Sequence, residues 1–435
     1  MAATHTIKSA LGRIISLADT WALPSLAQSQ YWPLKRQKAF QSKRLVDIYT
    51  YHYDNTPAYR QLCCQNGLTS RSISGIEDLH KLPAVDRNWM RMNCSPRNSK
   101  FFRGSMMRTG GSTGEPLEYI GCRRYDALRN GVHRRGWGYF GFGDGCEFTL
   151  ITSAQGKVAN GRYLSGELDN ENISKVVDAL NSDGNPYVRA YASSAAIVAI
   201  YMLQHGIENN KVKVFNLISE NLYDWQRDVI KTAFTCADVY EEYCCNDGGA
   251  SAWECSCHSG LHEAIERAII EPDSDGEMLV TDLWNRAMPF IRYKNGDYLV
   301  ERVQDKCECG RTLPRIRVRG RTNDVLVTPN GPVSPSYLLH WGSGCDAKTG
   351  QTFNSGFAQV QYIQSPGYCL TVNMVKNDLY KDSDFTRLKE QVERICCGMH
   401  ITYQFVDRIE TTPSGKRRFM INNDLEMLLK WKAGA

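Results

Sequence analysis

The sequence lacks the features that are typical of several classes of protein. It has no apolar run long enough to cross a bilayer, so a transmembrane segment is not expected. It has no low-complexity segment and no internal repeat, which argues against a disordered protein or a solenoid. Its charge is close to balanced, with 52 Lys and Arg against 47 Asp and Glu, and no basic run is interleaved with aromatic residues. A nucleic-acid partner is therefore not expected.

No secretory leader is evident at the start of the sequence. Residues 1–21 carry apolar side chains at helical spacing, but Arg13 and Asp19 interrupt any signal-peptide core. The segment predicts an amphipathic helix packed on the body of the protein, and the protein is expected to be cytoplasmic. The 16 cysteines are then expected to be reduced thiols, either buried or bound to metal, because disulfide frameworks belong to secreted proteins.

The order of the apolar segments predicts an α/β fold. Between residues 146 and 243, strand-like runs alternate with helical ones, which favours parallel strands joined by helices. The expected strands are 148–151, 187–191, 212–218 and 239–243, and the expected helices are 36–53, 195–203 (capped by Ser193 or Ser194) and 225–234. After about residue 320, a strand over 368–375, an amphipathic helix and a strand over 401–406 predict a small α+β domain.

A short loop within residues 108–117 combines glycines with hydroxyl side chains. Its residues are Thr109, Gly110, Gly111, Ser112, Thr113 and Gly114. Glycine leaves backbone N–H groups unobstructed, so the loop is suited to holding a phosphate, although an exposed flexible turn has the same composition. It is not an ATPase P-loop, because Glu115 and Pro116 stand where that motif has its lysine and hydroxyl residue. A lysine with suitable neighbours occurs far downstream, at Lys416.

Five blocks occur in a recognisable order along the chain. They are residues 108–117, 243–249 (Tyr-Cys-Cys-Asn-Asp-Gly-Gly), 293–297 (Tyr-Lys-Asn-Gly-Asp), 320–324 (Gly-Arg-Thr-Asn-Asp) and 414–416 (Ser-Gly-Lys). This series resembles the motifs of adenylate-forming enzymes, within them the phenylacetate-coenzyme A ligase branch and its capsular-polysaccharide relatives. The resemblance implies a large multilayer α/β adenylation domain over residues 1–320, which binds ATP and a carboxylic acid, and a small mobile α+β lid domain over 321–435.

The resemblance also implies a role for the blocks of the large domain. Residues 109–114 would hold the β- and γ-phosphates of ATP, and Tyr243 and Asn246 would lie at the nucleotide. Asp247 stands where the family places an acidic Mg²⁺ ligand, which is usually glutamate. Asp297 would accept hydrogen bonds from both ribose hydroxyls, a task suited to a carboxylate with two acceptor oxygens.

Two further residues are assigned to the lid side of the site. Activating a carboxylate with ATP places negative charge on phosphorus oxygens, so a cation near those oxygens stabilises the transition state. The resemblance implies that Lys416 supplies this cation and that Arg321 assists the nucleotide from the domain junction. Many relatives have aspartate at the position of Asn323, and asparagine also tolerates the backbone change of a hinge.

A second constellation consists of cysteines and histidines. The candidates are Cys255, Cys257, His258 and His262, followed by Cys307 and Cys309. Cys-x-Cys together with a Cys/His cluster supplies the ligands that tetrahedral Zn²⁺ prefers, and four protein ligands would make the site structural. Some relatives have zinc in these two places, and the resemblance selects Cys255, His262, Cys307 and Cys309; Cys257 or His258 could substitute, and buried free thiols are the alternative. The other histidines, His133 among them, are expected to be ordinary core or surface residues.

Together these observations predict an ATP-dependent ligase. It would convert a small carboxylic acid to an acyl-adenylate with release of pyrophosphate, and pass the acyl group to a thiol such as coenzyme A or to an amine. A non-catalytic nucleotide-binding relative that keeps the fold and the zinc site is the alternative, for which Asp247 and Asn323 are the support. A zinc hydrolase is disfavoured, because four cysteine-rich ligands leave no open coordination position. A homodimer is compatible with the sequence.

Overall fold

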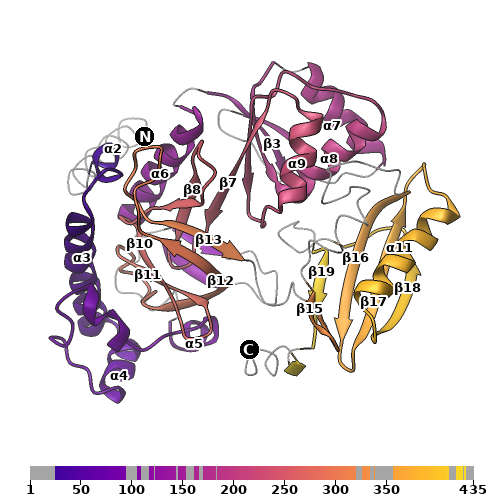
Figure 1. The fold of residues 1–435 in the computed structure, drawn as a ribbon. Helices are drawn as coiled ribbons and strands as arrows, with labels where there is room; N and C mark the ends of the chain where they lie inside the picture. Colours follow the sequence, from indigo (N-terminus) through magenta and orange to yellow (C-terminus); the bar gives the residue numbers. More distant parts are fainter. Residues whose placement is uncertain are drawn as a thin grey trace, which may run out of the picture. The chain divides into compact units, whose positions relative to one another are not determined.

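The structure is a computed structural model of the 435-residue chain. It describes residues 25–94, 105–108, 117–121, 123–143, 146–152, 161–165, 170–182, 184–319, 326–333, 338, 356–410, 418–424 and 426–427. These residues form two compact units (Figure 1). The first unit contains the described residues before position 145 together with 242–318, and the second contains 146–241 and the described residues from 319 onward. The predicted helix within residues 1–21 lies outside the described residues, and the domain boundary at 320 and 321 stays a prediction.

Helices form the start of the first unit. They are α2 (Leu26–Ser29), α3 (Leu34–Asn55), α4 (Pro57–Gln65), the 3₁₀ helix η1 (Ile76–Lys81), α5 (Arg87–Asn93), α6 (Arg123–Trp137) and the 3₁₀ helix η3 (Gly138–Phe140). Helix α3 confirms the helix predicted over 36–53, and it buries Leu45, Ile48 and Tyr49 on one face. It ends where Pro57 begins α4, because proline is favoured in the first turn of a helix and cannot extend a preceding one.

The sheet of the first unit is mainly antiparallel. Its strands are β8 (Ser251–Glu254), β9 (Leu261–Glu263), β10 (Ala268–Pro272), β11 (Glu277–Asp282), β12 (Tyr293–Val303) and β13 (Arg315–Arg319), with the end of β7 (Asp238–Cys244). The strand order is β10-β11-β12-β13-β9-β8-β7. A separate hairpin pairs β1 (Ser105–Arg108) with β2 (Glu118–Gly121). The sequence analysis does not anticipate these strands, because several of them, such as β8 and β9, are buried along their whole length and show no period-two alternation.

The second unit contains the predicted alternation of strands and helices. The elements are β3 (Phe148–Thr152), β4 (Gly161–Ser165), α7 (Asn170–Ser182), β5 (Tyr187–Tyr191), α8 (Ala192–Gln204), β6 (Val214–Ile218), α9 (Asp224–Ala233) and the start of β7. Strands β4, β3, β5 and β6 pair in parallel in that order. The apolar faces of α7, α8 and α9 pack with β5 and β6 in one core. The α/β prediction for this segment is therefore confirmed.

The predicted cap of α8 is wrong. The helix begins at Ala192, so Ser193 and Ser194 lie inside its first turn and neither side chain caps it. The Glu220 carboxylate, which follows β6, accepts a hydrogen bond of 2.9 Å from the Ser193 backbone N–H instead. A carboxylate at a helix N-terminus satisfies a backbone donor and is favoured by the helix dipole, so the serines are not needed as caps.

The C-terminal part of the second unit is a small α+β structure, as predicted. Its elements are β14 (Leu326–Thr328), β15 (Gly331–Val333), β16 (Phe357–Ser365), β17 (Cys369–Lys376), α11 (Asp382–Ile395), β18 (His400–Phe405) and β19 (Met420–Asn422). The four-stranded sheet has the order β18-β17-β16-β19, and α11 lies along one face of it (Figure 1). Leu388 and Val392 of α11 are buried in its core. In neither unit is a described helix both long and apolar enough to cross a bilayer.

Candidate functional site

A tight loop after β7 places Asn246 and Asp247 at the carboxyl end of that strand. The loop closes with a hydrogen bond of 2.8 Å from the Cys245 backbone N–H to the Ala250 carbonyl. Gly248 and Gly249 have φ angles of 93° and 84°, a conformation that other residues rarely adopt. At Gly249 a Cβ would also lie 2.9 Å from a carboxylate oxygen of Asp282. Glycine is therefore required in this turn, which fixes the path of the residues before it.

Tyr243 and Asp297, two predicted nucleotide-binding residues, contact each other directly. The Tyr243 hydroxyl donates a hydrogen bond of 2.7 Å to Oδ2 of Asp297 and accepts one of 2.8 Å from the Asn295 side-chain amide. Asn295 in turn accepts a hydrogen bond of 3.0 Å from the Asp297 backbone N–H. Burial raises the pKa of Tyr243 well above its usual value, and the charge of Asp297 adds to the effect, so the phenol stays protonated and remains the donor. Both side chains are partly exposed, which leaves them within reach of a ligand.

Asp247, the predicted Mg²⁺ ligand, is buried and held by neighbours from two other elements. Its Oδ2 accepts a hydrogen bond of 3.0 Å from the Tyr293 hydroxyl at the start of β12. The Arg87 guanidinium, at the start of α5, lies 3.8 Å from the same oxygen. The Cys245 thiol donates to Oδ1 at 3.2 Å. The carboxylate is thus fixed in orientation and partly neutralised by the protein itself.

Several predicted site residues lie outside the described part of the chain. These are the loop residues 109–114, Arg321 and Lys416. The structure does describe the strands that precede and follow the loop: β1 and β2 pair antiparallel, with Arg108 opposite Glu118. The roles of the loop, Arg321 and Lys416 therefore stay predictions.

The four cysteine and histidine residues selected for zinc come together in the first unit. Their ligand atoms all lie within 4.8 Å of one another, and three of the four residues are buried. The Sγ atoms of Cys255 and Cys307 are 3.8 Å apart, and Sγ of Cys309 is 3.4 Å from Nε2 of His262. Two thiolates on a tetrahedral Zn²⁺ with Zn–S bonds of about 2.3 Å would be about 3.8 Å apart, and a thiolate and an imidazole about 3.5 Å. The donor set and its spacing therefore fit zinc.

Local turns explain how the chain brings these ligands together. The Gly310 N–H donates a hydrogen bond of 2.8 Å to the Cys307 carbonyl, and Gly310 has a φ angle of 88°. This turn directs Cys307 and Cys309 to the same point. Burial lowers the pKa of His262 to about 4, with nearby arginines adding to the effect, so the imidazole is neutral, which is the form that binds metal.

The two alternative ligands, Cys257 and His258, are not in the group of four. Nδ1 of His258 lies 3.2 Å from the Glu254 carboxylate, which gives this ring a different partner. The structure therefore groups the four residues that the resemblance selected. The residues that sequence reasoning missed are Arg87, Tyr293 and Asn295, which position Asp247, Tyr243 and Asp297. Of these, Tyr293 and Asn295 lie in the 293–297 block, whereas no signal in the sequence pointed to Arg87.

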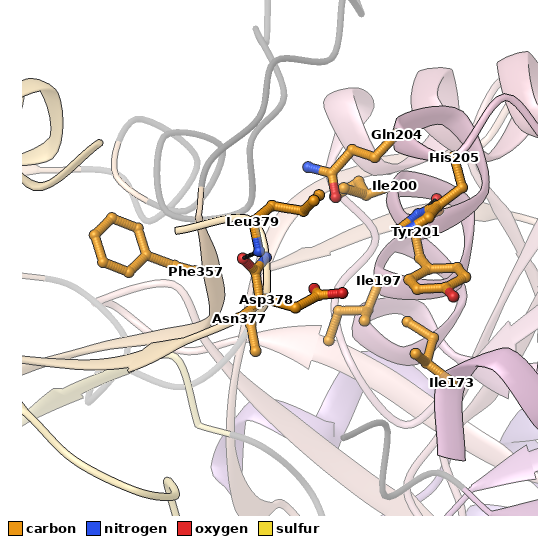
Figure 2. A pocket seen from close by; sticks show the side chains of 11 residues that line it. Ile173, Ile197, Ile200, Tyr201, Gln204, His205, Phe357, Asn377, Asp378 and Leu379 are labelled. Carbon is orange, nitrogen blue, oxygen red and sulfur yellow. Dashed lines mark hydrogen bonds between the residues drawn. The ribbon is translucent and has the colours of Figure 1, made fainter. Parts of the chain in front are cut away.

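A cavity in the second unit is a different kind of site. Figure 2 shows Ile197 and Ile200 of α8 on one side and Asp378 and Leu379, which follow β17, on the other. Its volume is about 50 Å³, whereas pockets for small molecules usually measure about 300–1,000 Å³. None of the predicted site residues lines it. It is therefore too small for a nucleotide.

Comparisons with known proteins agree with these features. Residues 348–423 match the family described as the CapK C-terminal domain. The chain is 24% identical over 417 residues to protein CapK of Staphylococcus aureus, covering 88% of each chain. It is 23% identical over 346 residues to phenylacetate-coenzyme A ligase of Thermus thermophilus, covering 70% of this chain and 75% of that protein.

Solved structures share the fold over nearly the whole chain. 2-Hydroxyisobutyryl-CoA ligase in its postadenylation state, in complex with R3-HIB-AMP, superposes with a TM-score of 0.67 and 16% identity, covering 95% of this chain and 97% of that one. The same ligase in its thioesterification state, in complex with 2-HIB-AMP and CoA, gives a TM-score of 0.58 and 17% identity, covering 95% and 97%. In sequence, this chain is therefore similar to CapK and to phenylacetate-coenzyme A ligase, and in fold it is similar to 2-hydroxyisobutyryl-CoA ligase.

Proposed function

We propose that this protein is an ATP-dependent ligase that activates a small carboxylic acid as an acyl-adenylate and then transfers the acyl group to coenzyme A or to an amine. The observation that carries the proposal is the contact between Tyr243 and Asp297, which joins two blocks of the motif series at the carboxyl end of β7. Ligands of α/β sheets bind at such strand ends. The names of the relatives support the same chemistry, since one is a phenylacetate-coenzyme A ligase.

The proposed reaction divides into two substitutions. In the first, a carboxylate oxygen attacks the α-phosphorus of ATP, and pyrophosphate leaves with the electron pair of the broken P–O bond. The backbone of residues 109–114 would hold the departing phosphates, and the Lys416 cation would neutralise the oxygens around the α-phosphorus. Asp297 would hold the ribose, and Asp247 would hold Mg²⁺. In the second substitution, a thiol or an amine displaces AMP from the acyl carbon.

We also propose that Cys255, His262, Cys307 and Cys309 hold a structural Zn²⁺. The spacing of their ligand atoms supports this assignment, and four protein ligands leave no position for a substrate. Three thiolates around one Zn²⁺ leave a net negative charge. Arg311 and Arg315 lie close enough to interact electrostatically with the cysteines, so their positive charges offset it.

The direct test is pyrophosphate release from ATP and Mg²⁺ with a panel of aryl acids, amino acids and short acyl acids, each with and without coenzyme A. Release with one class of acid would establish adenylation and name the substrate class. Dependence of product formation on coenzyme A would then separate thioester from amide chemistry. Binding of ATP without release for any acid would favour the non-catalytic alternative, and a panel member that releases pyrophosphate would exclude it.

The Asp297→Ala variant is expected to raise the KM for ATP by about 10- to 100-fold, since hydrogen bonds to a charged group contribute about 1.5–3 kcal/mol. Steady-state kinetics over a range of ATP concentrations measures the effect. Asp275→Ala, on the exposed turn between β10 and β11, is the matched control, and its KM should stay unchanged. An unaltered KM in Asp297→Ala would remove this carboxylate from ribose binding.

A further inference from the structure

Three side chains on α6 and β7 form a linear hydrogen-bonding array that the proposed adenylation does not use. Sγ of Cys244 lies 3.6 Å from Nε2 of His133. Nδ1 of the same ring lies 3.2 Å from Oε1 of Glu242. The other oxygen of Glu242 accepts a hydrogen bond of 2.9 Å from the Trp137 indole. A thiol, an imidazole and a carboxylate in this order, each within reach of the next, form the arrangement that activates a cysteine nucleophile.

Secondary-structure periodicity explains how the array forms. Glu242 and Cys244 are two residues apart on β7 and therefore project from the same face, opposite to Tyr243. His133 and Trp137 are four apart on α6 and share one face of that helix. Helix α6 approaches β8 closely, because a Cβ at Gly136 would collide with the Trp253 ring. That ring also contacts His133 edge-on, with centroids 5.0 Å apart.

The surroundings of Cys244 favour the thiolate. Burial alone would raise the pKa of this thiol, but the positive charge of His133, its hydrogen bond and the Arg267 guanidinium outweigh burial and lower the pKa to about 6. Burial would likewise lower the pKa of His133, yet Cys244 and Glu242 raise it to about 9. The pair is then a thiolate and an imidazolium near neutral pH.

Three further polar side chains lie near the Cys244 thiol. Arg267 Nη1 lies 3.9 Å from Sγ, Ser251 Oγ 3.7 Å and Asn246 Oδ1 3.6 Å. Arg267 is the additional cation, and the other two are neutral. Cys244 itself is partly exposed. It also directly follows Tyr243, and it precedes Asp247 by three residues, a span of at most about 11 Å of chain. The Tyr243 side chain projects from the opposite face of β7, but the thiol contacts Asn246, which is proposed to lie at the nucleotide.

We propose that Cys244 is a nucleophile that accepts the acyl group from the acyl-adenylate, with His133 as its proton partner and Glu242 as a positioning residue. This inference rests on the proposed function, which supplies the adenylate. The thiolate attacks the carbonyl carbon, the C–O bond to the phosphate breaks, and AMP leaves with the electron pair. The imidazolium proton of His133 passes to a phosphate oxygen of the departing AMP, which leaves His133 neutral. An amine or thiol acceptor then attacks the thioester carbon. Its proton passes to neutral His133, and the Cys244 thiolate leaves.

The reactivity of the thiol can be tested without any substrate. Alkylation of the full-length protein by iodoacetamide between pH 5 and 9, followed by peptide mapping, compares Cys244 with the exposed Cys236. At pH 6 we expect Cys244 to react at least about tenfold faster, because an ordinary thiol is less than about 1% ionised there. His133→Gln should move the profile of Cys244 to higher pH, because it removes the cation that favours the thiolate, whereas Glu242→Gln removes a carboxylate whose charge raises the pKa of the thiol and should move the profile to lower pH. Equal rates for the two cysteines, or a profile that neither variant moves, would overturn the activated nucleophile.

Acyl transfer is tested with the acid that releases pyrophosphate. After incubation with ATP, Mg²⁺ and that acid, the protein is quenched in acid and its intact mass is measured. We expect a gain equal to the acyl group, mapped to Cys244, removed by hydroxylamine, absent from Cys244→Ser and retained in Cys236→Ser. Pyrophosphate release without an adduct on Cys244 would overturn this inference and leave the proposed function standing, whereas no release at all would count against the proposed function.

Discussion

Replacing Cys307 and Cys309 together with serine is expected to remove about one zinc ion per chain and to lower the stability of the first unit by about 3–5 kcal/mol. The ion would join the β8–β9 segment, which supplies Cys255 and His262, to the turn after β12. A structural zinc contributes directly to folding, because the unfolded chain does not preserve the site, and apparent binding energies in zinc-finger peptides reach about 10–16 kcal/mol. We expect only part of that binding energy to be lost as stability here, because this unit has a larger hydrophobic core than a zinc-finger peptide.

The measurement is the zinc content by elemental analysis, together with thermal unfolding of the same samples. For a unit of this size, the expected loss corresponds to a Tm lower by about 6–20 °C. A double replacement of the exposed Cys369 and Cys397 by serine is the matched control, and it should change neither quantity. Wild-type protein purified without zinc and with the same Tm as the metal-loaded protein would contradict the site.

The segments that the sequence predicts well have one buried face and a clear period. Helix α3 and the elements α9 and β5 lie within two residues of their predicted bounds. Alternation of such segments also indicates the parallel pairing of β3, β5 and β6, because a strand followed by a helix returns in parallel. In the C-terminal part, α11 is the amphipathic helix predicted there, with Leu388 and Val392 on its buried face.

Prediction is poorer where contacts from distant parts of the chain decide the structure. The start of α8 depends on Glu220, which the sequence offers no reason to place beside Ser193. Strands β8 and β9 are buried on both faces, so they have no amphipathic pattern. In the candidate site, the contact of Tyr243 with Asp297 follows from a motif series, whereas the array at His133 depends on how closely α6 packs against β8. The sequence alone does not indicate which side chains a histidine in the middle of a helix will contact.

The second large effect is expected for Lys416→Ala, which should lower the rate of pyrophosphate release by about 10³-fold or more. A cation that contacts the transferring group stabilises charge that builds up only in the transition state, and such groups contribute about 10³–10⁵ to the rate in other phosphoryl-transfer enzymes. Binding of ATP should change little, because the loop, Asp247 and Asp297 are proposed to hold the nucleotide in the ground state. The KM for ATP should therefore stay within a few-fold while kcat falls.

Arg417→Ala is the matched control for this variant. It removes one positive charge from the same segment, which lies within the region that matches the CapK C-terminal domain. If Lys416 acts by contact with the reacting oxygens, kcat should fall only in Lys416→Ala, and Lys416→Arg should recover little activity because a planar guanidinium does not replace a compact ammonium. Equal losses in Lys416→Ala and Arg417→Ala would mean that the segment acts through its overall charge. In that case the cation at the α-phosphate would have to come from another residue, with Arg321 and Arg87 as the first to test.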